Sequence, residues 1–370
     1  MIPFSLAFLA LIFIPGISSN FLVNKLFGCA AILCLLLKPG FKIKFCSVQY
    51  LFGLWLAWVF VGSTFSDNNT IASIGYWGRM EGFLTWGLLS AMAWAYWTGC
   101  EEETKFELFK LPVTMRGLDL IFIASLLIFT SIVLVIMFVW PVQSMAFFLK
   151  IMPDNALAGF SSIGAVLLFA YTPIAAIPAV LAALCSANRT VLIAIVSGIT
   201  CFYLLTNFKR SLRASIIVFL ILLAIIPFTT IGKRISTLNT SVMGIGSRSQ
   251  WVLQGSELSK SVPVMGYGLD TLSVHLKPAK GKYIHKGVVV DRTHFLPIDL
   301  ILQTGWIGYY LALAMLACAL HVTLKYRTKQ NIICLSVIVS WIAFNCINPS
   351  GVYGHLIMLI ALFGIRKDQK

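Results

Sequence analysis

Apolar residues occur along most of the chain in long runs, which short polar breaks separate. About 20 residues rising 1.5 Å each cover the ~30 Å hydrocarbon core of a membrane, so most of these runs are long enough to cross it. They lie near 3–19, 21–37, 48–64, 82–99, 117–140, 158–172, 174–187, 190–206, 214–231, 298–323, 331–347 and 352–365. The pattern predicts an all-α, polytopic integral membrane protein with about 12 transmembrane helices.

The two runs on either side of Thr172-Pro173 are short. Proline removes a backbone donor and kinks or ends a helix. Residues 158–187 are therefore either one kinked helix or two separate spans, and the choice decides on which side of the membrane the later segments lie.

Basic residues are unevenly distributed among the short polar breaks. Five segments carry three each: Lys38/Lys42/Lys44, Lys105/Lys110/Arg116, Lys209/Arg210/Arg213, Lys325/Arg327/Lys329 and Arg366/Lys367/Lys370. The alternate breaks carry few, namely Arg79, Lys150 and Arg189. Because cytoplasmic loops are enriched in Lys and Arg, this alternation predicts that both ends of the chain lie in the cytoplasm.

The same topology divides the chain into three parts. Residues 1–231 form transmembrane helices 1–9, residues 232–297 form one long basic periplasmic loop with short helices, and residues 298–370 form helices 10–12 and a cytoplasmic tail. The long loop is the only sizeable extramembrane segment, so chemistry is expected there. The active site is expected on the outer face of the membrane.

Composition agrees with the membrane class, since 59% of residues are hydrophobic and only 11% are charged. The net charge of +15 comes largely from loop residues that set topology, so membrane lipids and not nucleic acid are the expected partners. The 9 cysteines lie in or beside apolar runs, without a CxxC pair or a Cys/His cluster. They are interpreted as small buried hydrophobes, and neither a metal site nor a cofactor is predicted.

The long loop contains a candidate anion site. Ser247 followed by Gln250 fits a capping box, which predicts a helix from Arg248 to about Lys260. Free N–H groups at a helix N-terminus attract anions, and an arginine there adds a bidentate donor for a diphosphate. The alternative is an interfacial helix with a solvated Arg248, and Trp251 and Leu258 are expected to lie on the membrane surface.

Two further motifs follow in the loop. The glycines of Gly266-Tyr267-Gly268 permit a tight turn where something approaches the backbone closely, although an ordinary loop turn explains them equally well. Pro297 suits the first turn of the next span, which places His294 just above the membrane. His294 is a candidate general base that Asp291 orients, or else an interfacial cap; Arg292 is expected to be a solvated charge.

Other arginines belong to the same side of the predicted topology. Arg189 lies in a short turn between two spans, where a charge is costly unless it snorkels or binds something. Arg79, in Gly78-Arg79-Met80-Glu81-Gly82, lies on the same face. Four distant stretches, around Arg79, Arg189, Arg248 and His294, are therefore expected to converge at one rim of the membrane.

These motifs together resemble the O-antigen ligase superfamily, which includes O-antigen polymerases and O-linked oligosaccharyltransferases. The resemblance is clearest over 180–310. It rests on an ordered set of short motifs: Asn188-Arg189, Gly246-Ser247-Arg248 with Trp251, Pro263 with Gly266-Tyr267-Gly268, Asp291 with His294, and Thr304-Gly305-Trp306-Ile307-Gly308. The family often has Ser where this chain has Asn188, and Asn where it has Phe295.

The resemblance implies a C-type membrane glycosyltransferase that works without metal and takes its glycan from undecaprenyl diphosphate. It implies that Arg189 and Arg248 hold the diphosphate and that His294 activates the acceptor hydroxyl. Arg79, Asp291 and Arg292 are the expected supporting residues. The favoured acceptor is lipid A–core, as for an O-antigen ligase. The resemblance also implies a location in a bacterial inner membrane, with the active site on its periplasmic face.

Other functions stay open at this point. A polymerase or a protein O-oligosaccharyltransferase shares the donor chemistry and differs in the acceptor. A lipid-linked glycan transporter is the alternative outside enzymes. Transporters usually place polar groups along a membrane path and contain two related halves, and neither feature is evident in the sequence.

Overall fold

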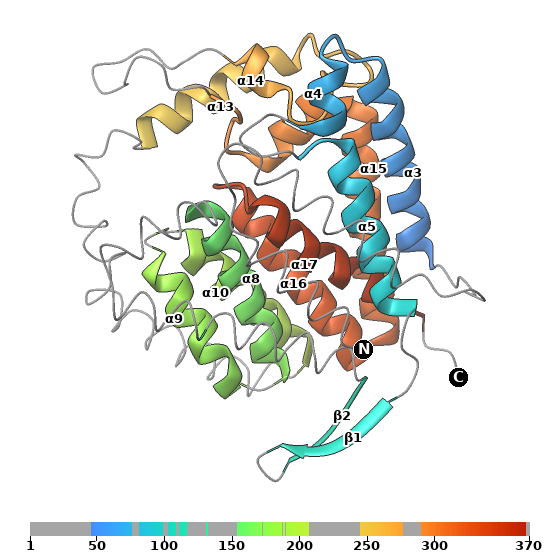
Figure 1. Cartoon of the computed structure of the whole chain (residues 1–370), viewed down its shortest axis with the longest axis vertical. Coiled ribbons are helices and arrows are strands. Elements are labelled where there is room, and N and C mark those ends of the chain that lie inside the picture. Colours follow the sequence, from blue (N-terminus) through green and yellow to red (C-terminus); the bar gives the residue numbers. More distant parts are fainter. Residues whose placement is uncertain are drawn as a thin grey trace.

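The computed structural model of the chain describes residues 46–75, 81–98, 103–108, 111–116, 131, 154–171, 173–186, 188, 190–206, 245–276 and 290–367. The helices are α3 (Ser47–Thr64), α4 (Asn69–Ile74), α5 (Phe83–Thr98), α8 (Asp154–Tyr171), α9 (Ile177–Cys185), α10 (Thr190–Thr206), α13 (Ile245–Ser259), α14 (Leu272–His275), α15 (Leu296–Tyr326), α16 (Lys329–Asn345) and α17 (Gly351–Gly364), with the 3-10 turn η2 (Pro173–Ala176). The prediction of a helical fold is confirmed (Figure 1).

One element departs from an all-α fold. Strands β1 (Glu103–Leu108) and β2 (Leu111–Arg116) pair antiparallel as a hairpin, with Glu103 opposite Arg116. This stretch was expected to be a short basic connection. Polar and apolar residues alternate from Lys105 to Leu108, which is the period-two pattern of a strand.

The number of spans stays a prediction. The predicted segments 3–19, 21–37 and 214–231, and 117–140 apart from Ser131, lie outside the described residues. Among the described helices, α3 and α15 are long and apolar enough to cross a membrane, judged by length and composition. Shorter apolar helices match the remaining predicted runs. The division of the chain at residues 231 and 297 likewise stays a prediction.

The centre of the bundle is formed by α8, α10, α16 and α17, which pack against one another, while α5 packs against α17 and α3 against α15. Large side chains such as Phe160 and Phe344 are fully buried there. Small residues allow close approach: a Cβ on Gly198 of α10 would lie 2.7 Å from Val166 of α8 and 2.9 Å from Ser340 of α16.

Residues 158–187 form two antiparallel segments and not one kinked helix. Near the start of α8, a Cβ on Gly159 would lie 2.6 Å from Ser350. After α9, the side chain of Asn348 donates to Asn188. Since Asn348 and Ser350 belong to one short connection, both ends of 159–188 lie at the same end of the bundle. The chain therefore runs away along α8 and returns through η2 and α9.

The opposite end of the bundle carries basic connections. There Asn331, at the start of α16, donates to the carbonyl of Arg366 (2.9 Å), and Gln49 of α3 donates to the carbonyl of Ile365 (3.0 Å). The segments Lys325–Lys329 and Arg366–Lys367 therefore share one end, and Asn188 and Asn348 lie at the other. This is the arrangement that the alternation of basic connections predicts.

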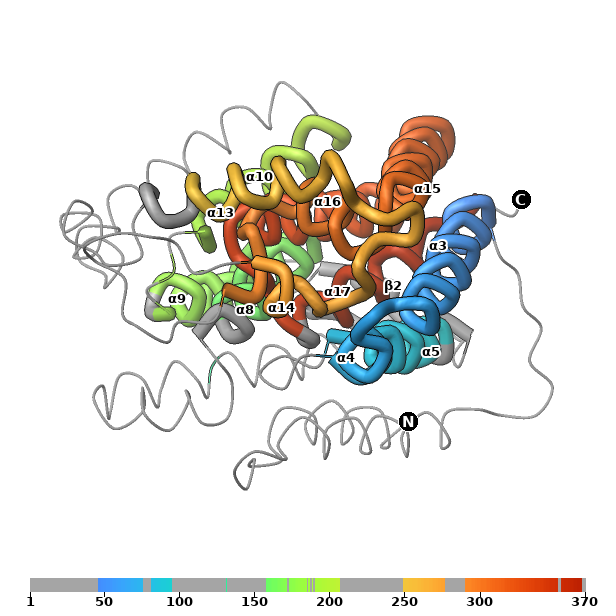
Figure 2. Tube along the Cα trace, turned by 90° about the horizontal axis from the view of Figure 1, so that it is seen from above, coloured from blue at the N-terminus to red at the C-terminus, as the bar shows by residue number. Residues whose placement is uncertain are grey.

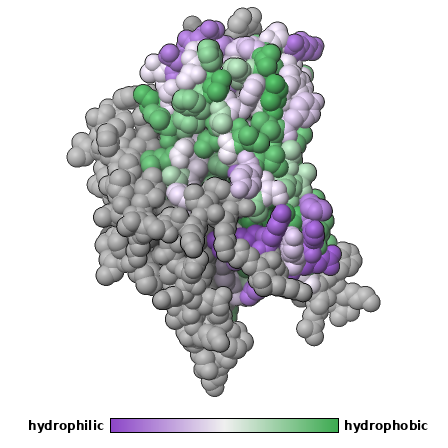
Figure 3. Space-filling view, turned by 90° about the vertical axis from the view of Figure 1, so that its right-hand side faces the viewer, coloured by the Kyte–Doolittle hydropathy of each residue, from purple (hydrophilic) through white to green (hydrophobic). Residues whose placement is uncertain are grey.

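Helices α3 and α15 present an apolar outer face. Large side chains on both helices are exposed, among them Leu54, Phe60, Tyr310, Leu313 and Leu320. Figure 3 shows hydrophobic residues along the middle of this side of the molecule and hydrophilic residues toward its ends. A protein in water rarely exposes so continuous an apolar face, which agrees with a location in a membrane.

Helices α13 and α14 lie across one end of the bundle (Figures 1 and 2). They enclose a second small core in which Trp251, Leu272, Leu276, Val290 and Leu302 are buried. The prediction of short helices in the long loop is therefore confirmed for the described residues 245–276. This small core holds the loop against the start of α15.

Candidate functional site

The loop from Pro263 to Asp270 is docked on a kink in α15. Gly305 interrupts the helix with φ 69°, which frees the carbonyls of the preceding turn. The N–H groups of Tyr267 and Gly268 donate to the carbonyls of Leu302 (2.8 Å) and Gln303 (3.1 Å). The glycine turn at residues 266–268 and the motif at the Gly305 kink therefore pack directly on each other. The close approach that was predicted as one explanation of these glycines is to the backbone of α15.

Only glycine fits at the closest points of this contact. Gly266 has φ 76°, and a Cβ there would lie 2.4 Å from the carbonyl carbon of Gln303. A Cβ on Gly305 would meet the carbonyl oxygen of Val264. The side chain of Trp58 on α3 adds a hydrogen bond to the carbonyl of Thr304 (2.8 Å). These contacts therefore hold the turn in one position against α15 and α3.

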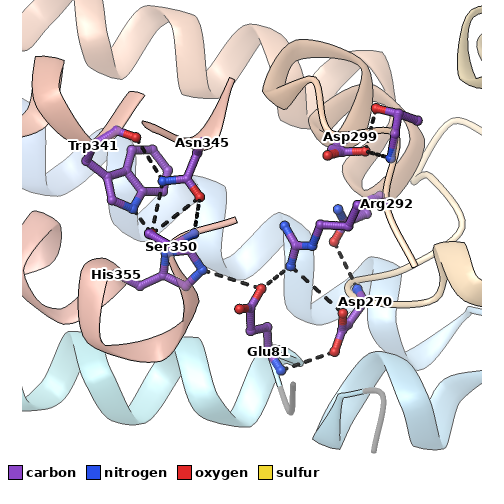
Figure 4. Close-up of polar contacts among 10 residues, drawn as sticks. Glu81, Asp270, Arg292, Asp299, Trp341, Asn345, Ser350 and His355 are labelled. Atoms are coloured by element: carbon purple, nitrogen blue, oxygen red, sulfur yellow. Dashed lines mark hydrogen bonds and ion pairs between the residues drawn. The ribbon is translucent and has the colours of Figure 1, made fainter. Parts of the chain in front are cut away.

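The docked turn places Asp270 in a buried cluster of charges (Figure 4). The N–H of Asp270 donates to the side-chain oxygen of Gln303 (2.9 Å), and its carboxylate accepts from the N–H of Glu81 (3.2 Å). The guanidinium of Arg292 forms a close ion pair with Glu81 and lies 3.8 Å from the carboxylate of Asp270. The cluster joins the start of α5, the loop after α13 and the segment before α15.

Arg292 was expected to be a solvated charge, and that expectation is wrong. Only 9% of the residue is exposed. Burial alone would lower the pKa of Arg292, but the carboxylates of Glu81, Asp270, Asp299 and Asp291 outweigh it and raise that pKa above its ordinary value. Sequence reasoning missed the burial because the two nearest carboxylates are 211 and 22 positions away in the chain.

His355 of α17 lies on the other side of Glu81. Its Nδ1 accepts a hydrogen bond from the indole N–H of Trp341 (3.0 Å), and its Nε2 lies 3.4 Å from the carboxylate of Glu81. Trp341 can only donate, so a neutral His355 carries its proton on Nε2, facing Glu81. The ring of Trp86 stacks on the imidazole with centroids 4.7 Å apart.

The segment that carries His294 is held from both sides of that residue. Arg292 is anchored in the charge cluster, and the N–H and hydroxyl of Thr293 both donate to Asp299 in the first turn of α15 (2.8 Å each). Pro297 lies in that first turn, as predicted. His294 itself has φ 61°, a left-handed conformation that a residue of this type adopts only when its surroundings enforce it.

Trp251 of α13 stacks on His294, with ring centroids 5.3 Å apart and ring planes at 28°. The same face of α13 continues to Gly255, where a Cβ would meet the side chains of Thr293 and Ile298. Two predictions for this helix are wrong. It begins at Ile245, so Ser247 is inside the helix and is not its cap, and Trp251 and Leu258 pack inward on the small core.

The family model of O-antigen ligase matches residues 174–313. Over this part, the chain is similar to proteins of the O-antigen ligase superfamily, which supports the resemblance seen in the sequence motifs. No curated protein matches the chain. Proteins of this superfamily are glycosyltransferase-like enzymes of bacterial inner membranes that use lipid-linked glycans. The matched region contains Arg189, Arg248 and His294, whereas Glu81, Asn348 and His355 lie outside it.

Of the predicted site residues, the structure describes the side chains of Asp291, Arg292 and His294, which lie in the segment before α15. Residue 248 lies in the first turn of α13, three positions before Trp251, and i and i+3 positions share a helix face. The side chain of Arg248 lies outside the described part, as do residues Arg79 and Arg189. Asn188 and Thr190, which flank Arg189, are described and buried.

Several residues of the site were not identified from the sequence. Glu81 was noted only as part of the stretch around Arg79, and Asp270 and His355 were not singled out. A usable signal existed for His355, which is a single imidazole within an apolar run. Asp291 is half-buried and contributes to the electrostatic environment of Arg292. Its predicted role in orienting His294 stays a prediction.

Proposed function

We propose that this protein is a metal-independent membrane glycosyltransferase that moves a glycan from undecaprenyl diphosphate to an acceptor hydroxyl. The favoured reaction is that of an O-antigen ligase acting on lipid A–core at the periplasmic face of the inner membrane. The observation that carries the proposal is the stack of Trp251 on His294. It joins the helix that contains Arg248 to the segment of the candidate base, although 43 positions separate the two rings.

The first turn of α13 suits the departing diphosphate. Residues 245–248 carry the free N–H groups of the helix N-terminus, and the helix dipole adds a positive field. In the proposal, Arg248 and Arg189 stabilise the charge that develops on the leaving oxygen. Removing one preorganised stabiliser of this kind commonly slows a reaction by roughly 10²–10³-fold.

His294 supplies the base in this proposal. The acceptor oxygen forms a bond to the anomeric carbon, the bond from that carbon to the phosphate oxygen breaks, and the hydroxyl proton passes to the imidazole. General base catalysis of this type contributes roughly 10²–10⁴-fold. Its left-handed backbone and the bonds of Thr293 to Asp299 hold His294 in one position before substrate binds.

Arg292 has a different part in the proposal from Arg189 and Arg248. Its guanidinium faces Glu81 and Asp270, so its charge is already balanced inside the protein. We assign it the role of holding the segment that carries His294 in place, and not that of a diphosphate ligand. Arg79 and Asp291 remain the proposed supporting residues at the rim, in a topology of about 12 spans with both ends in the cytoplasm.

Transfer by the purified protein tests the proposal. Detergent-purified protein is incubated with a glycan on undecaprenyl diphosphate and with lipid A–core, and product is followed on a lipopolysaccharide gel. We expect Arg248→Ala and His294→Ala each to abolish transfer while the protein still inserts. Transfer by the purified protein alone would exclude a transporter.

Matched controls exist at the end of α13 and on α15. Lys260, just after α13, forms an exposed ion pair with Glu257, and His321 is an exposed residue of α15. Lys260→Ala and His321→Ala should transfer glycan at the normal rate. Unchanged product from Arg248→Ala and His294→Ala would refute the assignment of both residues.

A deletion strain distinguishes the acceptors. Loss of all capped core indicates the ligase, and a core capped by a single repeat indicates a polymerase. Normal capping with unglycosylated pilin indicates a protein O-oligosaccharyltransferase. The donor chemistry and the roles of the site residues are the same in all three.

A further inference from the structure

The connection between α16 and α17 forms a second polar structure at the same end of the bundle. It is buried, with Asn345, Asn348 and Ser350 each at most 5% exposed. It lies outside the region that the O-antigen ligase family model matches. Buried amides and hydroxyls are costly unless they are hydrogen-bonded, so their partners are informative.

The side chain of Asn348 bonds both neighbours of Arg189. Its Nδ2 group donates to the side-chain oxygen of Asn188 (3.0 Å) and to the hydroxyl of Thr190 (2.6 Å). The side-chain oxygen of Asn188 also accepts from the N–H of Thr190 (3.0 Å). One amide thus joins the residues on both sides of position 189 at the start of α10.

The connection is itself held firmly, which makes it a suitable support. Asn345 donates to the hydroxyl of Ser350 (3.0 Å) and accepts from its N–H (3.0 Å). Ser350 fits closely against glycines of two helices, since a Cβ would lie 2.6 Å from it on Gly159 and within 2.5 Å on Gly354. Since Ser350 is also the N-cap residue of α17, the connection is packed against α8 at the point where α17 begins.

We propose that Asn348 is a positioning residue that sets the Arg189 turn for the donor diphosphate. This inference rests on the proposed function, in which Arg189 holds that diphosphate. Asn348 acts through the side chains of Asn188 and Thr190 and does not itself contact substrate. Where this family often has Ser at position 188, the longer amide of Asn188 reaches both Asn348 and the N–H of Thr190.

Kinetics of Asn348→Ala test the proposal. Transfer is measured with purified protein over a range of donor concentrations. Small displacements of a binding group commonly cost up to about 10²-fold, so we expect kcat/KM for the donor to fall roughly 10- to 100-fold while KM for the acceptor changes little. Thr190→Val removes only one of the two bonds of Asn348, preserves side-chain shape, and should give a smaller loss of the same kind.

Asn331→Ala is the matched control. Asn331 is also a buried asparagine of the α16–α17 pair, and its side chain bonds the N–H and carbonyl of Arg366 at the opposite end. A loss of stability alone would affect both variants similarly. Equal kinetic effects of Asn348→Ala and Asn331→Ala would overturn the positioning role.

A double-mutant cycle with Arg189→Lys separates positioning from general packing. If Asn348 acts through Arg189, Asn348→Ala should lower kcat/KM by less than about 2-fold further in the Arg189→Lys background, because coupled residues are not additive. Full additivity would contradict the inference. Normal transfer by Arg189→Ala and His294→Ala would instead contradict the proposed function itself.

Discussion

The indole of Trp251 lies stacked on the imidazole of His294, and Trp251 is only 5% exposed. No local pattern in the sequence predicts that α13 contacts the segment before α15. The stack fixes the face of α13 toward the segment before α15. Trp251 is therefore expected to control both the stability of the loop and the position of the candidate base.

Truncation of Trp251 should damage both properties. Trp251→Ala removes a buried aromatic side chain, which commonly costs about 3–5 kcal/mol, and leaves His294 without its stacking partner. We expect a lower midpoint of thermal unfolding in detergent and a strong loss of glycan transfer. Trp251→Phe keeps an aromatic ring and should retain most of the transfer. Leu253→Ala on the same helix is the control, since Leu253 is 65% exposed.

Loss of the Glu81 charge should destabilise the segment from Arg292 to His294, which precedes α15. Glu81→Gln leaves the buried guanidinium of Arg292 without its closest carboxylate, and breaking a buried ion pair from one side costs about 3–5 kcal/mol. We expect a fall in thermal stability together with a loss of transfer. The comparison is Glu257→Gln, which breaks an exposed pair worth about 0–1 kcal/mol. Equal stability of the two variants would show that the cluster is not needed.

Much of the fold follows from local pattern, because a membrane helix is defined by a continuous apolar run. The described helices α3, α5, α8, α10, α15, α16 and α17 lie within or close to predicted runs. Pro297 lies in the first turn of α15, as predicted, so His294 immediately precedes the start of this helix. The glycines at 266 and 268 are consistent with a turn that another part of the backbone approaches closely, since few other residues permit this conformation.

The site depends instead on contacts between distant segments. The ion pair of Arg292 with Glu81 and the bonds of Asn348 to Asn188 join residues 211 and 160 positions apart. No local spacing encodes such pairs. The start of α13 was misplaced for a related reason: the Ser247–Gln250 spacing fits a capping box, but the helix extends to Ile245. Spacing of two residues alone does not show whether a helix continues before them.

Alanine at Gly266 should prevent the loop from docking on α15. A Cβ at this position would lie 2.5 Å from the carbonyl oxygen of Gln303, and φ 76° disfavours any side chain. We expect Gly266→Ala to lose folded protein in detergent and all transfer. Gly87 of α5 is the control, because a Cβ there has no neighbour within 4 Å. Gly87→Ala should be neutral or stabilise by about 0.5–1 kcal/mol. Normal folding of Gly266→Ala would contradict the described contact.

Acid should weaken the packing of α14 through His275. Burial lowers the pKa of His275 below its ordinary value of 6.5, against the opposing charge of Asp67, and the ring of Tyr267 stacks on it with centroids 4.1 Å apart. The folded protein therefore binds fewer protons at this residue than the unfolded chain does. The stabilising contribution is complete above pH 6.5 and is lost as the pH falls from 6.5 toward the lowered pKa.

His275→Gln isolates this contribution from that of the other titrating groups. Glutamine does not titrate, so the midpoint of thermal unfolding should fall less between pH 8 and pH 5 in the variant than in the wild-type protein. The difference between the two curves should appear below pH 6.5 and be absent above it. A difference that instead grew above that pH would mean that the folded state favours the protonated imidazole, which is opposite in sign to the effect of burial.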